Sequence, residues 1–402
     1  MCDHPKKMKF MRSGLLIAAA SSAVPPSPLV YHAPRLLGGP LVIDGDLDKE
    51  EWAVAPWSSP FADIRGTDAP DGSEPSAACR TRMKMLWDDD FLYIAAILES
   101  DFEVAATFTQ RNSPIFHSDS DFEVFIDASS TCHGYKELEM NARNVVWNLL
   151  LTRPYADGGG EHSGRIAQSG DDNYYEVAAQ RTATRLLAGR LNDPAAGATW
   201  AVEIAMAHSD TVARQPTARP PAVGERWRIN FSRVERRGEI NWTWQPQIAW
   251  DARSRRYAGH VNMHLPDAWG LVHFSAAGDA HVGQAHGPQT EDEPLSGADS
   301  ARQAAIHLYY AQHAALDMHG RFAASVDELH ELALIDSKAL ADHLALSVAL
   351  SGGDELVVGH AGPPAGEGAC YGPRRFLVTA VDHASGTAVS VTNERLVSTR
   401  SI

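Results

Sequence analysis

Residues 81–98, TRMKMLWDDDFLYIAAIL, decide the fold of the larger part of the chain. Apolar and polar residues alternate through Thr81 to Trp87, three aspartates follow, and Phe91 to Leu98 is a strongly apolar run. Two β-type runs joined by a short polar turn predict an antiparallel hairpin, although this turn lacks the glycine of the most favourable hairpin loops.

Similar short runs continue on both sides of this hairpin, separated by loops rich in glycine and proline. Because strand-like runs far outnumber helical periods, we predict a mainly β chain whose residues 38–276 form an antiparallel β-sandwich. The other expected strands are Leu41 to Ile43, Phe122 to Asp127, Tyr135 to Ala142, Val145 to Leu151, Trp200 to Met206, Trp227 to Val234 and Leu271 to Phe274.

The segments that flank the sandwich have different compositions. Residues 25–37 are rich in proline and small residues, and residues 277–298 are polar, so both are interpreted as linkers. Residues 299–402 begin with a helical period over Ala301 to Met318 and return to β-type runs after residue 345. We expect a small α+β domain there and assign it no role.

The composition restricts the partners. The 402 residues include 35 basic and 51 acidic ones, a formal charge of −16. A nucleic-acid partner is not expected, because phosphate binding needs a basic surface. An acidic chain suits neutral ligands and cations held by oxygen atoms, such as calcium.

Residues 1–24 are interpreted as a signal peptide. Four basic residues up to Arg12 precede the short apolar run Gly14 to Ala20, and small residues follow. The run is too short to span a bilayer. We therefore expect a secreted or extracytoplasmic protein without a membrane span.

The chain has four cysteines, at positions 2, 79, 132 and 370, and none of them forms a CxxC pair. A cysteine zinc site is therefore not expected. One disulfide, between Cys79 and Cys132, is compatible with an oxidising compartment. The spacing does not establish it.

An ordered series of short segments resembles the family 9 carbohydrate-binding modules and their stand-alone relatives, which have a β-sandwich related to the DOMON-like fold. The order and spacing of the segments match over roughly 235 residues. The matching segments are Ile43 to Asp48 with Glu51-Trp52 and Ala55 to Trp57, Thr81 to Asp89 with Leu92 to Ala96, Asp119 to Asp127, Tyr135 to Asn141 with Val146-Trp147, Trp227 to Glu235, and Asn262 to Pro266 with Trp269-Gly270.

This resemblance implies binding of a poly- or oligosaccharide without catalysis, often beside a separate polysaccharide-degrading enzyme, and sometimes structural calcium. The sequence departs from the family pattern in two respects. It has no recognisable hydrolase domain, and the segment Ile248 to Gly259 is unusually basic.

Strand alternation selects the candidate binding residues. If Phe122, Leu138 and Ile229 face the core, their strands present polar residues on the opposite face, where carboxylates, amides and guanidinium groups can bind sugar hydroxyls. The alternative is an ordinary solvated outer face. Trp52 and Trp57 are expected in the core, whereas other tryptophans can stack on sugar rings. The predicted carbohydrate-binding residues are Trp87, Glu123, Tyr135, Glu137, Asn141, Trp147, Arg228, Asn230 and Trp244.

Asp119 and Asp121 are the candidate calcium ligands. They are two residues apart, so that in an extended segment their carboxylates point the same way, and calcium prefers oxygen ligands. The spacing is not that of an EF-hand. A plain solvated loop is the alternative.

Two other functions are compatible with the residues. A glycoside hydrolase needs a pair of carboxylates, which Glu123, Glu137 and Glu139 can supply. A haem- or metal-binding DOMON-like domain would need axial ligands, for which the candidates are Met140, Met263, His264 and His117. The sequence contains no GxSxG, HExxH, P-loop or GxGxxG motif. Noncatalytic carbohydrate binding remains the main prediction.

Overall fold

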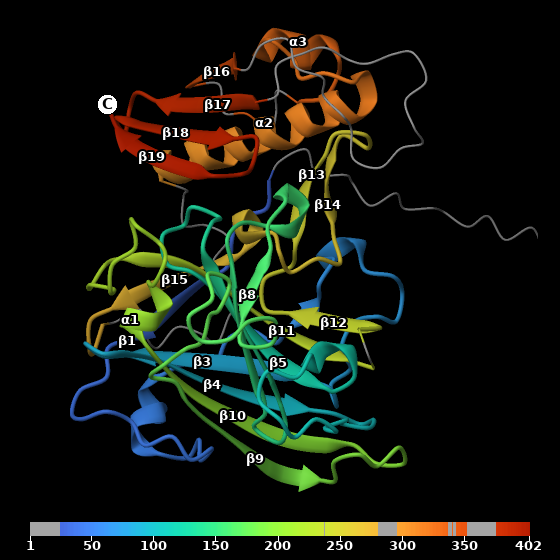
Figure 1. The fold of residues 1–402 in the computed structure, drawn as a ribbon, viewed down its shortest axis with the longest axis vertical. Helices are drawn as coiled ribbons and strands as arrows, with labels where there is room; N and C mark the ends of the chain where they lie inside the picture. The colour runs from blue at the N-terminus through green and yellow to red at the C-terminus, as the bar shows by residue number, and fades with distance from the viewer. Residues whose placement is uncertain (1–24, 237, 280–295, 337–339, 341–342, 352–374) are drawn as a thin grey trace, which may run out of the picture.

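The structure, a computed structural model, describes residues 25–236, 238–279, 296–336, 340, 343–351 and 375–402. It confirms a mainly β chain with a two-sheet sandwich and a smaller α+β unit above it (Figure 1). The large sheet has the strand order β1-β15-β11-β5-β6-β7-β8, and β12 and β2 extend it beside β11. Its strands are β1 (Val30–Pro34), β2 (Ala62–Asp63), β5 (Asp121–Asp127), β6 (Tyr135–Asn141), β7 (Val146–Leu151), β8 (Glu161–Ser163), β11 (Arg226–Glu235), β12 (Ile240–Thr243) and β15 (Gly270–Ser275).

The small sheet has the order β3-β4-β10-β9. Its inner face packs against the large sheet, and apolar side chains such as Phe122, Leu138, Trp200 and Ile229 fill the space between them. This agrees with the inward-facing residues expected from alternation. The strands are β3 (Thr81–Trp87), β4 (Phe91–Glu99), β9 (Arg181–Gly189) and β10 (Ala198–Ala207).

The predicted hairpin is β3 and β4, with Thr81 opposite Leu98 and Trp87 opposite Leu92. Its turn needs no glycine because none of Asp88, Asp89 and Asp90 has a positive φ, and the Asp88 carboxylate adds further bonds to the turn. Asp88 Oδ1 accepts the backbone N–H groups of Asp90 at 2.8 Å and Phe91 at 2.7 Å. Aspartate commonly closes turns by such local bonds.

Several strands were missed by the sequence pattern, and Leu41 to Ile43, expected as a strand, is not one. β1 lies in the segment interpreted as a linker, and it pairs in parallel with β15, which is some 240 residues away in the chain. β9 is largely exposed along its length and shows no buried alternation. The basic segment after Ile248 is a separate two-stranded hairpin of β13 (Ile248–Asp251) and β14 (Arg256–Gly259).

The opening motif of the family resemblance covers the outer face of the small sheet. Glu203, on β10 and fully buried, binds this segment with both carboxylate oxygens. It accepts the backbone N–H groups of Asp44 at 2.8 Å and Gly45 at 2.9 Å, the Trp52 indole N–H at 2.8 Å and the Lys49 ammonium at 2.6 Å. Trp52 is buried, as expected.

The C-terminal unit is α+β, as predicted. Its sheet has the order β16-β17-β18-β19, and α2 packs on β17 and β18. Ser296 and Ser325 cap the two helices by accepting the N–H groups of Asp299 and Glu328. The elements are α2 (Gly297–His319), α3 (Val326–Glu331), β16 (Leu344–Ser351), β17 (Arg375–Asp382), β18 (Thr387–Thr392) and β19 (Val397–Ser401).

The short helices of the sandwich lie in its loops, and several of them position the site described below. They are η1 (Glu50–Val54), η2 (Gly66–Asp68), η3 (Ile115–His117), η4 (Tyr155–Asp157), α1 (His208–Thr211) and η5 (Pro266–Ala268).

A network of polar contacts holds the C-terminal unit on the sandwich. Arg395 is almost fully buried and pairs with Asp157 at 3.0 Å and Asp267 at 2.9 Å. Trp250, from the β13–β14 hairpin, packs against α2 and donates its indole N–H to the Leu334 carbonyl at 2.9 Å. The basic hairpin is therefore a docking element for α2 (Figure 1).

Cys79 and Cys132 are both buried free thiols, so the suggested disulfide is not formed. They belong to different apolar clusters, one in the sandwich and one below α2. The predicted signal peptide, Cys2, Cys370 and most of the second linker lie outside the described residues. Within the described ranges, none of the helices combines the length and the apolar character needed to cross a bilayer.

Candidate functional site

The outer face of the large sheet carries four carboxylates, which we call the acidic cluster: Asp121, Glu123, Glu137 and Glu139. β5 and β6 pair so that Asp121 lies opposite Asn141 and Glu123 opposite Glu139. β7 adds a third residue beside the Glu123–Glu139 pair, because Trp147 lies opposite Glu139. Strand alternation thus brings Trp147, Glu139 and Glu123 into one line across three strands, as the period-two pattern predicted.

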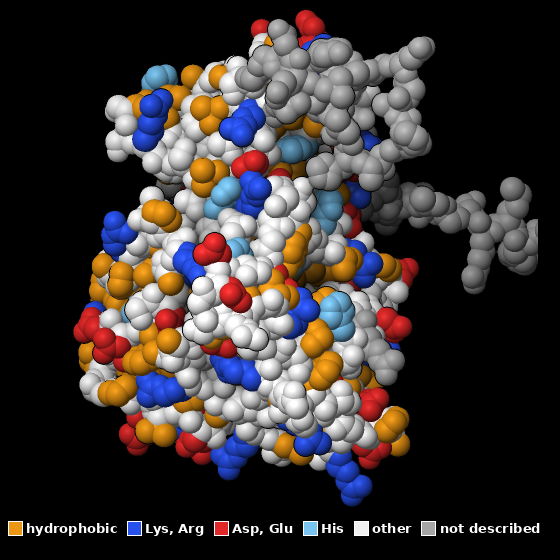
Figure 2. All heavy atoms as spheres, in the orientation of Figure 1, with side chains coloured by type: hydrophobic (Ala, Val, Ile, Leu, Met, Phe, Trp, Pro, Cys, Tyr) orange, Lys and Arg blue, Asp and Glu red, His pale blue; other side chains and the backbone are white. Residues whose placement is uncertain are grey.

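This face is covered and not solvated, which differs from an ordinary outer face. Phe116 packs over it from η3, and Met263 and Trp269 pack over it from the segment before β15. All four carboxylates are buried; Glu137, for example, is only 5 % exposed. In the view of Figure 2, charged side chains of both signs are scattered over the sandwich and do not form one large patch of a single sign.

Burial raises the pKa of every carboxyl group in the acidic cluster. Removal from water is the largest cause in each case, and repulsion between the carboxylates adds to it for Asp121, Glu137 and Glu139. The pKa of Glu123 rises to about 7. No ion pair in the described part of the chain includes any of the four, so the cluster is poised to gain protons or a cation.

Several polar atoms of this face have no hydrogen-bond partner. Asp121 Oδ1 accepts the Val234 N–H at 2.9 Å, but its Oδ2 is unpaired. Glu137 Oε2 and the Trp147 indole Nε1 are also buried and unpaired. A buried polar atom without a partner costs on the order of 1–3 kcal/mol. The face therefore has hydrogen-bonding capacity that the protein itself does not use.

The residues of the acidic cluster fit a calcium ion. Asp121, Glu123 and Glu139 each place a carboxylate oxygen within 4.8 Å of the others, and Asp121 Oδ2 is free to bind. Calcium takes hard oxygen ligands, and carboxylates are the strongest of these. Asp119, however, is a wrong prediction. Its oxygens accept the N–H groups of Thr107 and Phe108 and the Asn141 amide, so it anchors a loop.

Aromatic rings line the approach to the cluster. Tyr155, on η4, is 45 % exposed, and its ring centroid lies 4.6 Å from that of His264. His264 Nδ1 bonds the Tyr135 hydroxyl at 2.9 Å, and burial lowers the His264 pKa to about 4, so this imidazole is neutral at pH 7. The Arg165 guanidinium covers the Trp147 ring at 5.0 Å.

Four predicted binding residues have structural tasks instead. Trp87 and Trp244 are packed in the core between the sheets, so they cannot stack on a ligand. The Asn230 amide binds both backbone groups of Gln245, at 2.9 and 3.0 Å. The Asn141 side-chain oxygen accepts the backbone N–H groups of Arg143 and Val145. For the two asparagines the reason is that alternation predicts the face of a strand, but not the loops that cover it; the two tryptophans lie on the opposite, core-facing side.

The remaining predicted residues divide into two groups. Glu123, Tyr135, Glu137 and Trp147 lie together on the covered face. Arg228 is on the same sheet but reaches the junction with the C-terminal unit. Tyr155 was missed, because a lone tyrosine in a loop carries no sequence signal. Glu139 was considered only for catalysis, although its spacing of two from Glu137 placed it on this face.

The haem interpretation is wrong for Met140. That side chain points into the sandwich core, whereas Met263 packs on the outer side of the large sheet. His264, the other axial candidate, has its Nδ1 bound to Tyr135. Met140 and His264 therefore lie on opposite sides of one sheet and cannot share an iron atom.

Residues 43–218 match the family model described as carbohydrate family 9 binding domain-like. The resemblance found in the sequence is therefore confirmed for this segment, which includes the acidic cluster, Trp147 and Tyr155. The match ends before β11, and it covers neither Arg228 nor the C-terminal unit.

Solved structures with a related fold were also found. A family 9 module from Caldicellulosiruptor kristjanssonii, in complex with cellotriose, is 16 % identical, with a TM-score of 0.36 over 62 % of this chain and 95 % of that one. The same organism's module in complex with glucose is also 16 % identical, with a TM-score of 0.36 over 62 % of this chain and 97 % of that one. A putative carbohydrate-binding protein from Bacteroides uniformis is 12 % identical, with a TM-score of 0.43 over 62 % of this chain and all of that one. No curated protein matches the sequence.

Proposed function

We propose that the sandwich binds a neutral oligo- or polysaccharide without cleaving it, at the covered outer face of the large sheet. The match of residues 43–218 to a carbohydrate-binding family carries the class of ligand. The location rests on the unpaired Glu137 carboxylate oxygen and the unpaired Trp147 indole N–H, which lie on neighbouring strands of the same face.

These groups supply the two kinds of contact that a sugar needs. A carboxylate accepts hydrogen bonds from hydroxyl groups, and bonds to a charged acceptor are the stronger ones. An aromatic ring offers its face to the apolar side of the sugar. Tyr155 is exposed enough to do so directly, whereas Trp147 is buried beneath the Arg165 guanidinium, which would have to move for its ring to stack on a sugar.

The acidic cluster would hold calcium in this proposal. Asp121, Glu123 and Glu139 are its ligands, and Glu137 is left to face the sugar. A bound cation would remove the repulsion between carboxylates that otherwise raises their pKa values. The metal would fix the positions of its three carboxylate ligands, and side chains of the protein would recognise the sugar.

Export and a role beside a separate glycan-degrading enzyme complete the proposal. The basic-then-apolar pattern of residues 1–24 supports export. A noncatalytic binding module would bring a partner enzyme to the polymer, in agreement with what the family resemblance implies.

A glycan-array screen of the full chain, with calcium and with chelator, tests the function. Each bound glycan is then incubated with the protein and assayed for new reducing ends. Calcium-dependent binding without release is the expected result. Release that disappears in Glu137→Gln would instead support the glycoside hydrolase alternative, and no binding to any neutral glycan would contradict the proposal.

A further inference from the structure

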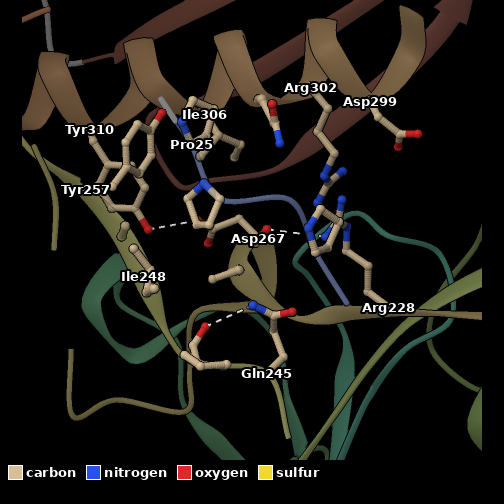
Figure 3. Close-up of a pocket in the computed structure, with 16 residues that line it drawn as sticks. Pro25, Arg228, Gln245, Ile248, Tyr257, Asp267, Asp299, Arg302, Ile306 and Tyr310 are labelled. Atoms are coloured by element: carbon tan, nitrogen blue, oxygen red, sulfur yellow. Dashed lines mark hydrogen bonds between the residues drawn. The ribbon is translucent and has the colours of Figure 1, made fainter. Parts of the chain in front are cut away.

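A small cavity of about 60 Å³ lies between the sandwich and the C-terminal unit. Its walls come from both parts of the chain: Arg228 and Tyr257 belong to the sandwich, and Arg302 and Ile306 belong to α2. Figure 3 shows Arg302 descending from the helix and Arg228 rising from the sheet, with their guanidinium groups pointing toward one another.

The two arginines are buried, and neither forms an ion pair with a carboxylate of the described residues. Arg228 is 6 % and Arg302 is 7 % exposed. Arg228 donates to the backbone carbonyls of Asp267 at 3.3 Å and Trp269 at 3.0 Å, and Arg302 donates to the Ser130 carbonyl at 2.6 Å. The Nε–H of each guanidinium has no hydrogen-bond partner among the described residues.

The carboxylates that line the cavity are engaged elsewhere. Asp267 pairs with Arg395 at 2.9 Å through Oδ1 and accepts the Tyr310 hydroxyl at 2.8 Å through Oδ2. Asp299 pairs with Arg226 at 3.3 Å and accepts the Ser296 hydroxyl at 2.6 Å.

Two groups just outside the cavity do not neutralise the arginines either. Asp127, opposite Arg228 in the sheet, accepts the Cys132 N–H at 2.7 Å and the Gln215 amide at 2.8 Å. The Cys132 sulfur lies 3.4 Å from Arg302, but burial raises the pKa of this thiol to about 12, so it is uncharged. Two buried like charges thus face each other without a counter-charge of their own, an arrangement that is costly unless an anion joins it.

We propose that this cavity binds the carboxylate of a small molecule, whose oxygens accept N–H groups of the Arg228 and Arg302 guanidiniums. Guanidinium groups bind carboxylates through pairs of N–H donors, which makes arginine suited to this anion. Apolar side chains, among them Pro25, Ile248 and Ile306, also line the cavity and suit a short carbon skeleton.

The site goes beyond the proposed sugar function, because it uses residues outside the family match and none of the acidic cluster. Since one arginine comes from each part of the chain, the anion would also link the C-terminal unit to the sandwich. The carboxylate can belong to a free organic acid or to an acidic sugar, and both present the same planar pair of oxygens.

Calorimetric titration of the full chain tests the proposal, with acetate, D-glucuronate and neutral D-glucose as probes at constant ionic strength. We expect one carboxylate per chain and no glucose at this site. The affinity should fall at least tenfold in Arg302→Met and also in Arg302→Lys, which keeps the charge but loses the fork. Arg321→Met is the matched control, because Arg321 is an exposed arginine of the same unit that pairs with Glu328.

Thermal unfolding separates loss of the site from loss of the fold. Without added carboxylate, Arg302→Met should melt at or above the wild-type temperature, because one of two like charges is gone. A saturating carboxylate should raise the melting temperature of wild type and Arg321→Met, but not of Arg302→Met. If Arg302→Met does not fold, the titration of Arg302→Lys decides alone.

The probes also identify the source of the carboxylate. Glucuronate binding tenfold tighter than acetate would indicate an acidic sugar, and equal affinities would indicate a free organic acid. The absence of saturable binding by both probes, or undiminished binding in the Arg302 variants, would overturn the proposal. Neither result affects the glycan-array test, which depends on Glu137, Trp147 and the acidic cluster.

Discussion

Glu203 and Glu137 are both buried glutamates on the outer faces of the sandwich, but their surroundings differ sharply. Glu203, on the small sheet, receives two backbone N–H groups, an indole N–H and the Lys49 ammonium. Glu137, on the large sheet, has an unpaired oxygen and lies among other carboxylates. Both faces are covered by loops, so burial alone does not distinguish them.

The difference separates a structural carboxylate from one kept for a ligand. A buried charge with a complete set of partners holds its covering segment in place, whereas a buried charge without partners lowers stability. Proteins retain the second kind where function needs it. The small sheet is therefore the scaffold, and the large sheet carries the proposed site.

The largest effect that would sharpen this comparison is expected from Glu203→Ala. Removing it leaves the Lys49 ammonium and three N–H donors without their acceptor, which should cost about 3–5 kcal/mol in the free energy of unfolding. Urea denaturation of the full chain measures this loss. Glu99→Ala, which removes an exposed partner of Arg80, should cost less than about 1 kcal/mol; equal losses in the two variants would contradict the assignment.

Glu137→Gln should behave in the opposite way. The amide has the same shape but no charge to bury, so stability should stay the same or rise by about 1 kcal/mol. The affinity for the best glycan of the array should fall at least tenfold, as measured by calorimetry. The comparison would break if the variant bound normally and lost as much stability as Glu203→Ala.

The pH dependence of stability tests the acidic cluster as a whole. The pKa of Glu123 is about 7 in the folded chain, above its ordinary value of 4.5. The folded state therefore holds more protons than the unfolded state between these values, and stability should fall as pH rises through this window. Each pKa unit corresponds to about 1.4 kcal/mol.

Thermal melts in chelator between pH 4.5 and 8 measure this fall. Glu123→Gln should flatten it. Calcium should raise the melting temperature more as the pH rises, because carboxylates that have lost their protons bind metal without releasing protons. A melting temperature that is insensitive to calcium at pH 8 would remove the metal from the proposal and leave a cluster of protonated acids.

The smallest effects are expected from two tryptophan substitutions. Trp147→Phe loses the unpaired indole N–H and part of a ring face, so glycan affinity should fall roughly three- to tenfold with little change in stability. Trp87→Phe should leave affinity unchanged and cost about 1–2 kcal/mol, because it opens a cavity in the core between the sheets. Calorimetry and urea denaturation of both variants give the contrast, and reversed effects would place the site elsewhere.

The sequence by itself determined the central strands of the sandwich and the faces on which their side chains lie. Alternation placed Phe122 and Leu138 inside and Glu123 and Glu137 outside, because side chains in a strand point to opposite faces with a period of two. The hairpin of residues 81–98 was equally local, so neighbouring residues sufficed to predict it.

Only the tertiary structure decided what covers those faces and which polar groups find partners. Asn141, Asn230 and Asp119 have the chemistry of ligands, but their polar atoms are bonded to other residues, such as Asp119, Gln245 and Thr107, that lie 22, 15 and 12 positions away in the chain. Arg228 meets Arg302 only because α2 docks on the sandwich. These pairings depend on contacts between residues that are not neighbours in the sequence. A local pattern does not specify which loop or helix will pack against a given strand.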